Sequence, residues 1–323
     1  MNQNLKTWKF IQKSIDQGWK VILLYVLESK GSSPGRQGFF MAVNDQGNMA
    51  GSIGGGIMEH KFVELAKSIL TNNSETNSVH LQVHSKSAPE HQSGMICSGE
   101  QTIFLHDIHE REKVQIVDLV SNLENKNIGW LYLSPEGIRF SVVEYGNVQG
   151  LEMNSVDDWK FQIKIGEKPI IHIIGGGHCS LALSKLMDFL DFEVHVYEDR
   201  PDLNTFVDNS FATKKVLVKH YSELSTEIPQ NENHFVVVMT FGYRTDDQVI
   251  RALKDWKFAF LGVLGSRKKI EKMRMDYHAE GFDSGWLQSI SAPVGLPIKS
   301  QTPEQIAVSI AAEIIGVMNK DLK

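Results

Sequence analysis

The 323-residue sequence predicts an α/β protein in two parts, an N-terminal α/β domain followed by a doubly wound parallel sheet. Two observations lead to this prediction. Strand-like and helix-like hydrophobic patterns alternate along the C-terminal half, and a turn of three glycines, Gly175–Gly177, joins the first such strand to the first helix. The length suits two domains of ordinary size, which we place at residues 1–150 and 165–323.

The composition is that of a soluble globular protein. Apolar residues make up 41% of the chain and charged residues 22%, which excludes the disordered and fibrous classes. The net charge of −6 argues against a general nucleic-acid binder, which needs a basic surface. The amino terminus lacks the apolar core of a signal peptide, and no stretch reaches the ~20 apolar residues that cross a membrane. The 2 cysteines cannot form a disulfide framework, so we expect a cytoplasmic protein.

The N-terminal half opens with an amphipathic helix. Leu5, Trp8, Ile11 and Ile15 follow at spacings of three and four, and Gly18 stands where a C-terminal cap is expected. The next run, WKVILLYVLES, is apolar and β-branched and predicts a buried strand. We expect a strand, a hairpin turn, a helix and two weaker strands at residues 38–43, 44–47, 57–70, 79–85 and 102–108.

A glycine-rich loop, Gly54-Gly55-Gly56, leads into the helix expected at 57–70. The unpaired backbone N–H groups and the positive dipole end at a helix start suit an anion, so this loop is a candidate ligand site. A loop that needs several residues at positive φ and holds no ligand would carry the same glycines. Both interpretations stay open on the sequence.

The two cysteines each allow a functional and a structural interpretation. Cys97 lies in SGMICSGE, where the closely flanking Gly94, Ser98 and Gly99 indicate that the thiol lies on a tight turn. Cys179 would begin a helix, where the pKa of a thiol tends to fall. A free cysteine usually packs as a small apolar side chain, which is the alternative at both positions. The histidines of the N-terminal half show no metal-ligand spacing, so no zinc site is expected.

The boundary between the two parts is expected between residues 145 and 168. The apolar periodicity fades there into the polar, glycine-containing stretch YGNVQGLEMNSVDDWKFQIKIGEK. After this stretch the periodicity becomes strong again, which places the start of the second domain near residue 165.

The second domain begins with a nucleotide-binding fingerprint. The run PIIHIIGGGHCSLALSKLMDFLDFEVHVYEDRPD has the pattern of strand, glycine turn, helix, strand and acidic turn. It fits the template G-x-G-x-x-G/A through Gly175, Gly177 and Ser180, and Glu198 or Asp199 is the acidic residue expected about 20 positions later. This order predicts a Rossmann-like unit. The ligand is less determined than the fold, because many such folds hold something other than a dinucleotide.

The alternation continues downstream with the strand HFVVVMT, the helix TDDQVIRALKDW and the strand FAFLGVLGS, and it ends in a helix capped by Thr302. The segment Gly265–Lys269 starts a helix with small residues and three cations, which is either an anion site or a solvated basic turn. Ligands of such sheets bind at the carboxyl ends of the strands. We therefore expect one crevice to be lined by Gly175–Cys179, Thr240–Arg244 and Gly265–Arg267.

Several blocks, taken in order, resemble the XdhC/CoxI family of accessory proteins, which serve the maturation of xanthine and carbon monoxide dehydrogenases. The resemblance runs from about residue 15 to about residue 318. It implies an N-terminal family domain followed by a Rossmann domain, and a maturation factor in place of a metabolic oxidoreductase. The blocks are GSSPGRQGFFMAV, GSIGGGIMEH, SGMICSGE, IIGGGHCSLAL, EDRPD, GVLGSRKK and APVGLPIKSQTPEQIAVSI.

The resemblance also implies a ligand and partners. The ligand would be the molybdenum cofactor, molybdopterin either bare or extended by a nucleotide, whose phosphate suits backbone N–H groups at helix starts. Cys97 would approach the metal as a soft ligand. The partners would be an apo molybdenum hydroxylase and a cysteine desulfurase, and shielding of the cofactor favours a homodimer. The predicted cofactor-binding residues are Gly54, Gly55, Gly56, Cys97, Gly175, Gly176, Gly177, His178, Asp199, Arg200, Arg244, Gly265, Ser266 and Arg267.

One segment departs from the family pattern. Many relatives carry a Thr-His-Asp type motif after the fourth Rossmann strand, whereas this chain has MTFGYRTDD from Met239 to Asp247. The histidine is replaced and Arg244 is present, so a role that depends on that histidine does not transfer to this chain.

Two other functions stay open. An NAD(P)-dependent oxidoreductase is suggested by the glycine turn and by the acidic turn after the second strand, with His178 or Tyr243 as the acid–base group. A nucleotide hydrolase would hold a metal on Asp246 and Asp247, although adjacent acids more often begin a helix.

Overall fold

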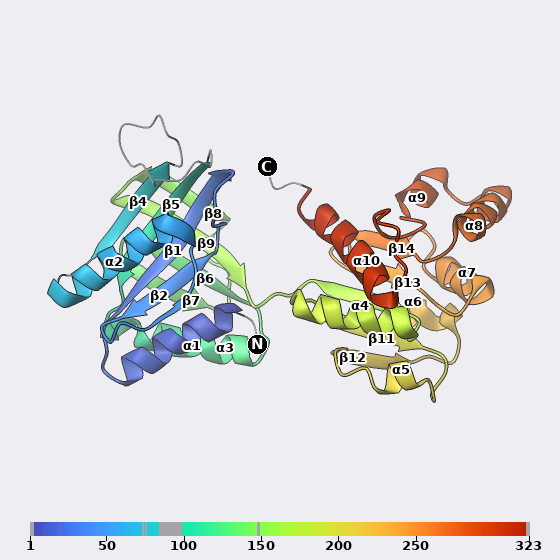
Figure 1. Cartoon of the computed structure of the whole chain (residues 1–323), viewed down its shortest axis with the longest axis horizontal. Helices are drawn as coiled ribbons and strands as arrows, with labels where there is room; N and C mark the ends of the chain where they lie inside the picture. The colour runs from blue at the N-terminus through green and yellow to red at the C-terminus, as the bar shows by residue number, and fades with distance from the viewer. Residues whose placement is uncertain (1–2, 73, 75, 84–98, 147–148, 321–323) are drawn as a thin grey trace. The chain divides into compact units, whose positions relative to one another are not determined.

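The chain forms two compact units, and the computed structural model describes residues 3–72, 74, 76–83, 99–146 and 149–320 (Figure 1). Unit 1 extends to Glu167, and unit 2 begins at Lys168. Each unit contains its own clusters of buried apolar side chains, so each has a core of its own.

Unit 1 contains two antiparallel sheets, with strand orders β3-β2-β1-β5-β4 and β7-β6-β9-β8. The elements expected from residue 5 to residue 108 lie where the sequence predicts them, as far as the structure describes those residues. The elements of unit 1 are α1 (Gln3–Asp16), β1 (Val21–Gly31), β2 (Phe40–Asn44), β3 (Met49–Gly51), α2 (Gly56–Asn72), β4 (Asn77–Val83), β5 (Gly99–Asp107), η1 (Glu110–Glu112), α3 (Lys113–Glu124), β6 (Gly129–Ser134), β7 (Gly137–Ser141), β8 (Gly150–Ser155) and β9 (Asp158–Ile165).

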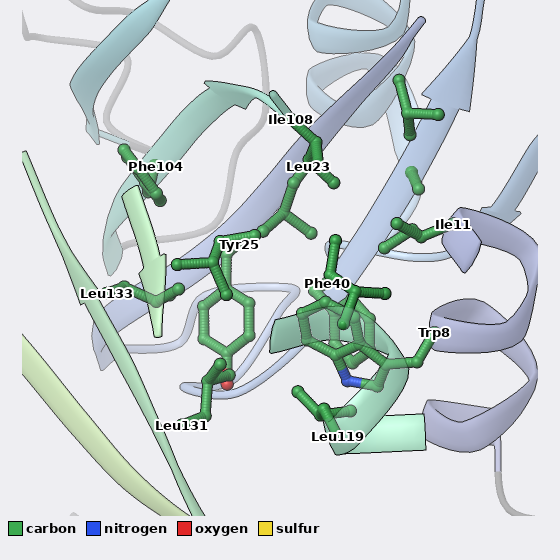
Figure 2. Close-up of a cluster of buried hydrophobic side chains, with 14 of the residues drawn as sticks. Trp8, Ile11, Leu23, Tyr25, Phe40, Phe104, Ile108, Leu119, Leu131 and Leu133 are labelled. Carbon is green, nitrogen blue, oxygen red and sulfur yellow. The ribbon is translucent and has the colours of Figure 1, made fainter. Parts of the chain in front are cut away.

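The strand β1 is buried on both faces, which explains its uninterrupted apolar sequence. On one face Ile22 belongs to a cluster with Phe62 of α2. On the other face Tyr25 belongs to the cluster that Figure 2 shows, in which α1, α3 and strands of both sheets contribute side chains. The rings of Trp8 and Phe40 in that cluster have centroids 4.9 Å apart. A strand covered on both faces loses the usual alternation of polar and apolar residues.

The stretch 145–168, which the fading periodicity marks as the boundary, contains two strands instead. β8 and β9 complete the second sheet of unit 1, and the chain enters unit 2 only after Glu167. In β9, Trp159 and Phe161 are buried while Lys160 is exposed. This alternation is that of a half-buried strand, and the polar residues around it hide it from a search for apolar stretches.

Unit 2 is built on a five-stranded parallel sheet with strand order β12-β11-β10-β13-β14. Numbered along the chain this is the order 3-2-1-4-5, so the predicted doubly wound sheet is confirmed. The buried clusters on its two faces draw on α4 and α10 on one side and on α7 and α8 on the other. The elements of unit 2 are β10 (Ile170–Ile174), α4 (His178–Phe189), β11 (Glu193–Glu198), α5 (Asn204–Val207), β12 (Lys214–Leu217), η2 (Tyr221–Glu223), α6 (Leu224–Glu227), β13 (Phe235–Val238), α7 (Tyr243–Ala252), β14 (Phe260–Val263), α8 (Arg267–Ala279), α9 (Ser284–Ser289) and α10 (Pro303–Met318).

Among the described residues, no helix combines the length and the apolar character that a membrane span requires.

Candidate functional site

The carboxyl edge of the parallel sheet in unit 2 brings together the turns that follow β10, β11, β13 and β14. Because the strand order reverses between β10 and β13, this edge is where such folds bind ligands. Direct contacts join neighbouring turns. A Cβ atom on Gly175 would lie 2.4 Å from the carbonyl oxygen of Met239, and the N–H of Leu264 donates to the oxygen of Val238 at 2.8 Å. The three segments expected around one crevice therefore lie at one edge of the sheet.

The three glycines after β10 have three different roles. Gly175 has φ of +105° and packs directly against Met239, so a larger residue is excluded there. Gly176 is confined by Phe206, whose Cβ would lie 2.8 Å from an added Cβ. Gly177 is the N-cap of α4 with φ of −71°, and an added Cβ would meet no atom within 4 Å. Only Gly177 leaves open space in front of the helix, next to the exposed His178.

The acidic residue at the end of β11 is fully buried and engaged by its own surroundings. Glu198 accepts hydrogen bonds from the N–H of Gly176 at 2.6 Å and from Nε and Nη2 of Arg200 at 2.8 and 3.0 Å. Burial works to raise the pKa of Glu198, but these hydrogen bonds and the charge of Arg200 outweigh it and hold the pKa at about 2. The carboxylate thus links the glycine turn to the turn after β11.

Its neighbour Asp199 is partly exposed, with 32% of its side chain accessible. Burial and the charge of Glu198 raise the pKa of Asp199. The side chain of Arg200 is 42% exposed and forms an ion pair with Glu198. Of the two predicted ligand residues at this turn, Asp199 therefore presents a carboxylate, and Arg200 presents a guanidinium that already has a partner.

A second buried acid, Asp246, organises the turn after β13. Its Oδ1 accepts hydrogen bonds from the N–H and the hydroxyl of Thr240 at 3.1 and 2.6 Å, and its Oδ2 accepts from Nζ of Lys269 on α8. The same Nζ donates to the carbonyl oxygen of Leu264 at 2.8 Å. A buried carboxylate with a charged partner and satisfied oxygens is a rigid connection. Asp246 and Lys269 thereby fix the ends of β13 and β14 relative to each other.

The start of α8 matches the anion-site interpretation in part. Ser266 is the N-cap, and its hydroxyl accepts from the N–H of Lys269 at 3.3 Å. Lys269 is used internally, so three free cations were not found. Arg267 and Lys268 are exposed and, within the described ranges, form no ion pair or hydrogen bond; the same holds for Arg244 at the start of α7. These three side chains are unpaired cations at this edge.

A cavity of about 380 Å³ opens beside the start of α8. Arg267 lines it together with residues 293–300 of the loop before α10. Its volume is in the range of small-molecule sites. A larger hollow of about 980 Å³ is lined by residues that precede and begin β14, at the other end of that strand.

The glycine loop of unit 1 has positive φ at all three glycines, as its ligand-free interpretation requires. Gly54, Gly55 and Gly56 have φ of +124°, +76° and +72°, so the conformation itself requires glycine. Oε2 of Glu59 accepts the N–H groups of Ile53 and Gly55 at 2.9 and 3.0 Å. The N–H of Gly55, expected to be unpaired, is therefore already bound to a carboxylate of the chain. Ligand binding at this loop stays a prediction and would require Glu59 to move aside.

Of the two cysteines, only Cys179 lies among the described residues. Cys97 lies outside the described residues, so its predicted contact with molybdenum stays a prediction. Cys179 packs against the cluster beneath α4, and burial together with the charge of Glu304 raises the pKa of its thiol. The fall in pKa that a helix start favours is absent, and the structure supports the packing role.

The acid–base and metal candidates have other partners. Tyr243 donates its hydroxyl to Asp276 on α8, and this hydrogen bond, with burial adding to it, raises the pKa of Tyr243 to about 12. Asp246 is bound to Lys269, and Asp247 accepts from Arg251 at 2.9 Å, so a metal held on Asp246 and Asp247 is contradicted. No group of three or more His, Cys, Asp or Glu residues in the described part of the chain could hold a metal.

Comparison with protein families identifies both parts of the chain. Residues 171–314 match the XdhC Rossmann domain, and residues 14–81 match the XdhC and CoxI family. The chain belongs to the XdhC and CoxI family. The predicted resemblance is thereby confirmed, and unit 2 is an XdhC Rossmann domain.

Similar proteins agree with this assignment. The chain is 22% identical, over 94% of its length, to the uncharacterized protein YqeB of Escherichia coli. It is 29% identical, over 47% of its length, to a probable xanthine dehydrogenase component of Bacillus subtilis. The chain spans 44% of the length of each of these two proteins. It is 20% identical over 96% of its length to the molybdenum cofactor insertion chaperone PaoD of Escherichia coli, spanning 87% of that protein. A crystal structure described as a xanthine dehydrogenase from Bacillus halodurans shares the fold, with a TM-score of 0.71, 18% identity and coverage of 100% of this chain and 97% of that one.

Two features of this edge were not anticipated from the sequence. The ion pair of Asp246 and Lys269 joins residues of two different helices, and no local pattern marks it. Phe241 lies between Thr240 and Gly242 and is exposed. A large aromatic residue in a turn, outside any core periodicity, is the signal that could have identified Phe241.

Proposed function

We propose that this protein is an accessory factor that binds the molybdenum cofactor and delivers it to a molybdenum hydroxylase of the xanthine dehydrogenase type. Family membership supports the maturation role, and the relative named as a molybdenum cofactor insertion chaperone supports the ligand. The site we propose is the carboxyl edge of the parallel sheet in unit 2.

The observation that carries the proposal is the charge distribution at this edge. Gly177 leaves the N-terminus of α4 open, and the unpaired cations Arg244 and Arg267 follow the neighbouring strands β13 and β14. Backbone N–H groups at a helix start, with arginines nearby, fit the phosphate that the pterin cofactor carries. The cavity of about 380 Å³ that Arg267 lines provides space next to that arginine.

The state of Glu198 favours this ligand over a dinucleotide. In a dinucleotide site the acid after the second strand binds the ribose hydroxyls. Here Glu198 is buried and bound to Gly176 and Arg200, and only the partly exposed Asp199 remains for a ribose. A titration with NADH followed by fluorescence tests the NAD(P) alternative. Micromolar binding would support the oxidoreductase, and no binding at millimolar concentration would exclude it.

The experiment that tests the proposal measures retention of the cofactor under anaerobic conditions. Cofactor released from a molybdenum enzyme is mixed with the protein, free cofactor is removed by ultrafiltration, and retained molybdenum and pterin are measured. Gly177→Asp places a carboxylate in front of α4, whereas Gly177→Asn has nearly the same shape without the charge. Both should fold, because φ at Gly177 is ordinary and the space is empty.

The expected result is retention by the wild type and by Gly177→Asn, and loss of at least tenfold in affinity for Gly177→Asp, since one unfavourable charge at an anion site costs about 1.4 kcal/mol or more. No retention by the wild type would overturn the proposal. Equal retention by both variants would overturn the assignment of the site.

The partners belong to the same proposal. We propose that the protein meets an apo molybdenum hydroxylase and a cysteine desulfurase in the cytoplasm and acts as a homodimer that shields the cofactor. Co-purification from cells that express each partner, with light scattering for the oligomeric state, tests these points. A monomer with full cofactor retention would contradict the homodimer alone.

A further inference from the structure

Phe241 has an unusual position for a large apolar side chain. It follows β13 at the carboxyl edge of the sheet, and 87% of its surface is exposed, the largest value among the exposed large apolar side chains in the described part of the chain. Single exposed apolar residues are common on protein surfaces, so exposure alone indicates nothing. What distinguishes Phe241 is that its surroundings hold it in place while leaving the ring uncovered.

Hydrogen bonds fix the backbone on both sides of Phe241. Thr240 donates its N–H to Asp246, which is anchored by Lys269. Gly242 donates its N–H to the hydroxyl of Thr245 at 3.2 Å. A turn held on both sides presents its middle side chain with little loss of freedom on binding, which favours a contact surface.

The ring of Phe241 is backed by a fixed cation. The guanidinium carbon of Arg200 lies 5.6 Å from the ring centroid, within the range of a cation–π contact. Arg200 is itself held by two hydrogen bonds to the buried Glu198, which also binds Gly176. The contacts therefore run without a break from the glycine turn through Glu198 and Arg200 to the ring.

We propose that Phe241, supported by Arg200, is the stacking surface for the planar heteroaromatic ring of the ligand. Flat, electron-poor ring systems such as a pterin prefer offset stacking on an aromatic face. The phosphate of the same ligand would lie toward the start of α4, where Gly177 leaves space. This inference rests on the proposed function, because it assigns the ring of that cofactor to a residue.

The chain offers a matched control. Phe189, at the C-terminal end of α4, is 82% exposed, and it lies one helix length from the glycine turn. Phe189→Ala removes the same side chain from a similarly exposed place. Phe241→Leu keeps an apolar side chain but removes the ring, and Phe241→Trp keeps an aromatic face.

The test uses the fluorescent oxidised pterin phosphate obtained from molybdopterin. Binding is followed by quenching of the pterin fluorescence, and retention of the complete cofactor is measured in parallel by ultrafiltration. Stacking accounts for a factor of about ten or more in affinity. We expect Phe241→Ala and Phe241→Leu to lose quenching and about tenfold or more in affinity, whereas Phe241→Trp and Phe189→Ala bind as the wild type does.

The outcomes separate this inference from the proposed function. If the wild type retains the complete cofactor and Phe241→Ala binds and quenches equally well, the stacking surface is overturned while the function stands. If Phe189→Ala shows the same loss as Phe241→Ala, the effect is not local, and the inference is overturned too. If the wild type retains no cofactor, the proposed function fails, and the stacking surface fails with it.

Discussion

Glu198→Gln tests whether a buried carboxylate holds the turns of the candidate site together. The hydrogen bonds to Glu198 hold its pKa at about 2, against an ordinary value of 4.5. A group whose pKa is lowered in the folded state stabilises the protein above its unfolded pKa and loses that effect as the pH falls toward the folded pKa. The difference between these two pKa values corresponds to a contribution of about 3 kcal/mol to the free energy of unfolding at neutral pH.

The assay is urea unfolding of the wild type and of Glu198→Gln at pH 7 and pH 3. We expect the variant to be about 3 kcal/mol less stable at pH 7. The difference should shrink to about 1 kcal/mol at pH 3, because below pH 4.5 the unfolded chain takes up a proton while the folded carboxylate is still mostly ionised. Glu271→Gln, on the exposed side of α8, should change stability little at either pH. A difference for Glu198→Gln that is absent at pH 7, or that does not change between the two pH values, would refute the reasoning.

Two further variants test other parts of unit 2. His172 is buried between Tyr197 and His234, and burial and the neighbouring histidines lower its pKa to about 3. Because the unfolded chain takes up a proton that the folded imidazole does not, the protein should lose about 2 kcal/mol of its free energy of unfolding from this group between pH 7.5 and pH 5. Urea unfolding should show that this loss disappears in His172→Gln, and an unchanged pH dependence in the variant would contradict the assignment. Lys269→Met leaves Asp246 buried without its cation and should cost about 3–5 kcal/mol in the same assay, with most of it recovered when Asp246→Asn is added. A double variant no more stable than Lys269→Met would show that the charge is not the cause.

The sequence predicts unit 2 well because its signals are local. A glycine turn between a strand and a helix needs only a few adjacent residues, and the positive φ of Gly175 shows the physical requirement behind it. The edge strand β12 gave no such signal. It is short and mostly exposed, so neither apolar length nor periodicity marks it.

The candidate site was predicted in its location but not in its chemistry. The segments that meet at the carboxyl edge follow from the fold, whereas the state of each polar group depends on side chains brought together by folding. Glu59 occupies the N–H of Gly55, and Glu198 occupies that of Gly176. In both glycine loops a carboxylate of the chain binds a backbone N–H group that the glycine pattern alone leaves open to an anion. Gly177 is the glycine of the two loops that combines open space around an added Cβ with an ordinary φ.

In unit 1 the missed strand has a similar cause. The alternation of Trp159, Lys160 and Phe161 is visible in the sequence, but its burial depends on a second sheet that closes over the cluster of Figure 2. Long-range closure of this kind leaves no mark in a short window of sequence.

Transfer of cofactor to an apo molybdenum hydroxylase of the xanthine dehydrogenase type tests the proposed function most directly. Equal amounts of cofactor are supplied free, loaded on the wild type, or mixed with Gly177→Asp, and the activity regained by the hydroxylase is measured. We predict that the loaded wild type restores more activity than free cofactor and that Gly177→Asp restores no more than free cofactor does. Equal activity from the loaded wild type and from free cofactor would contradict a delivery role.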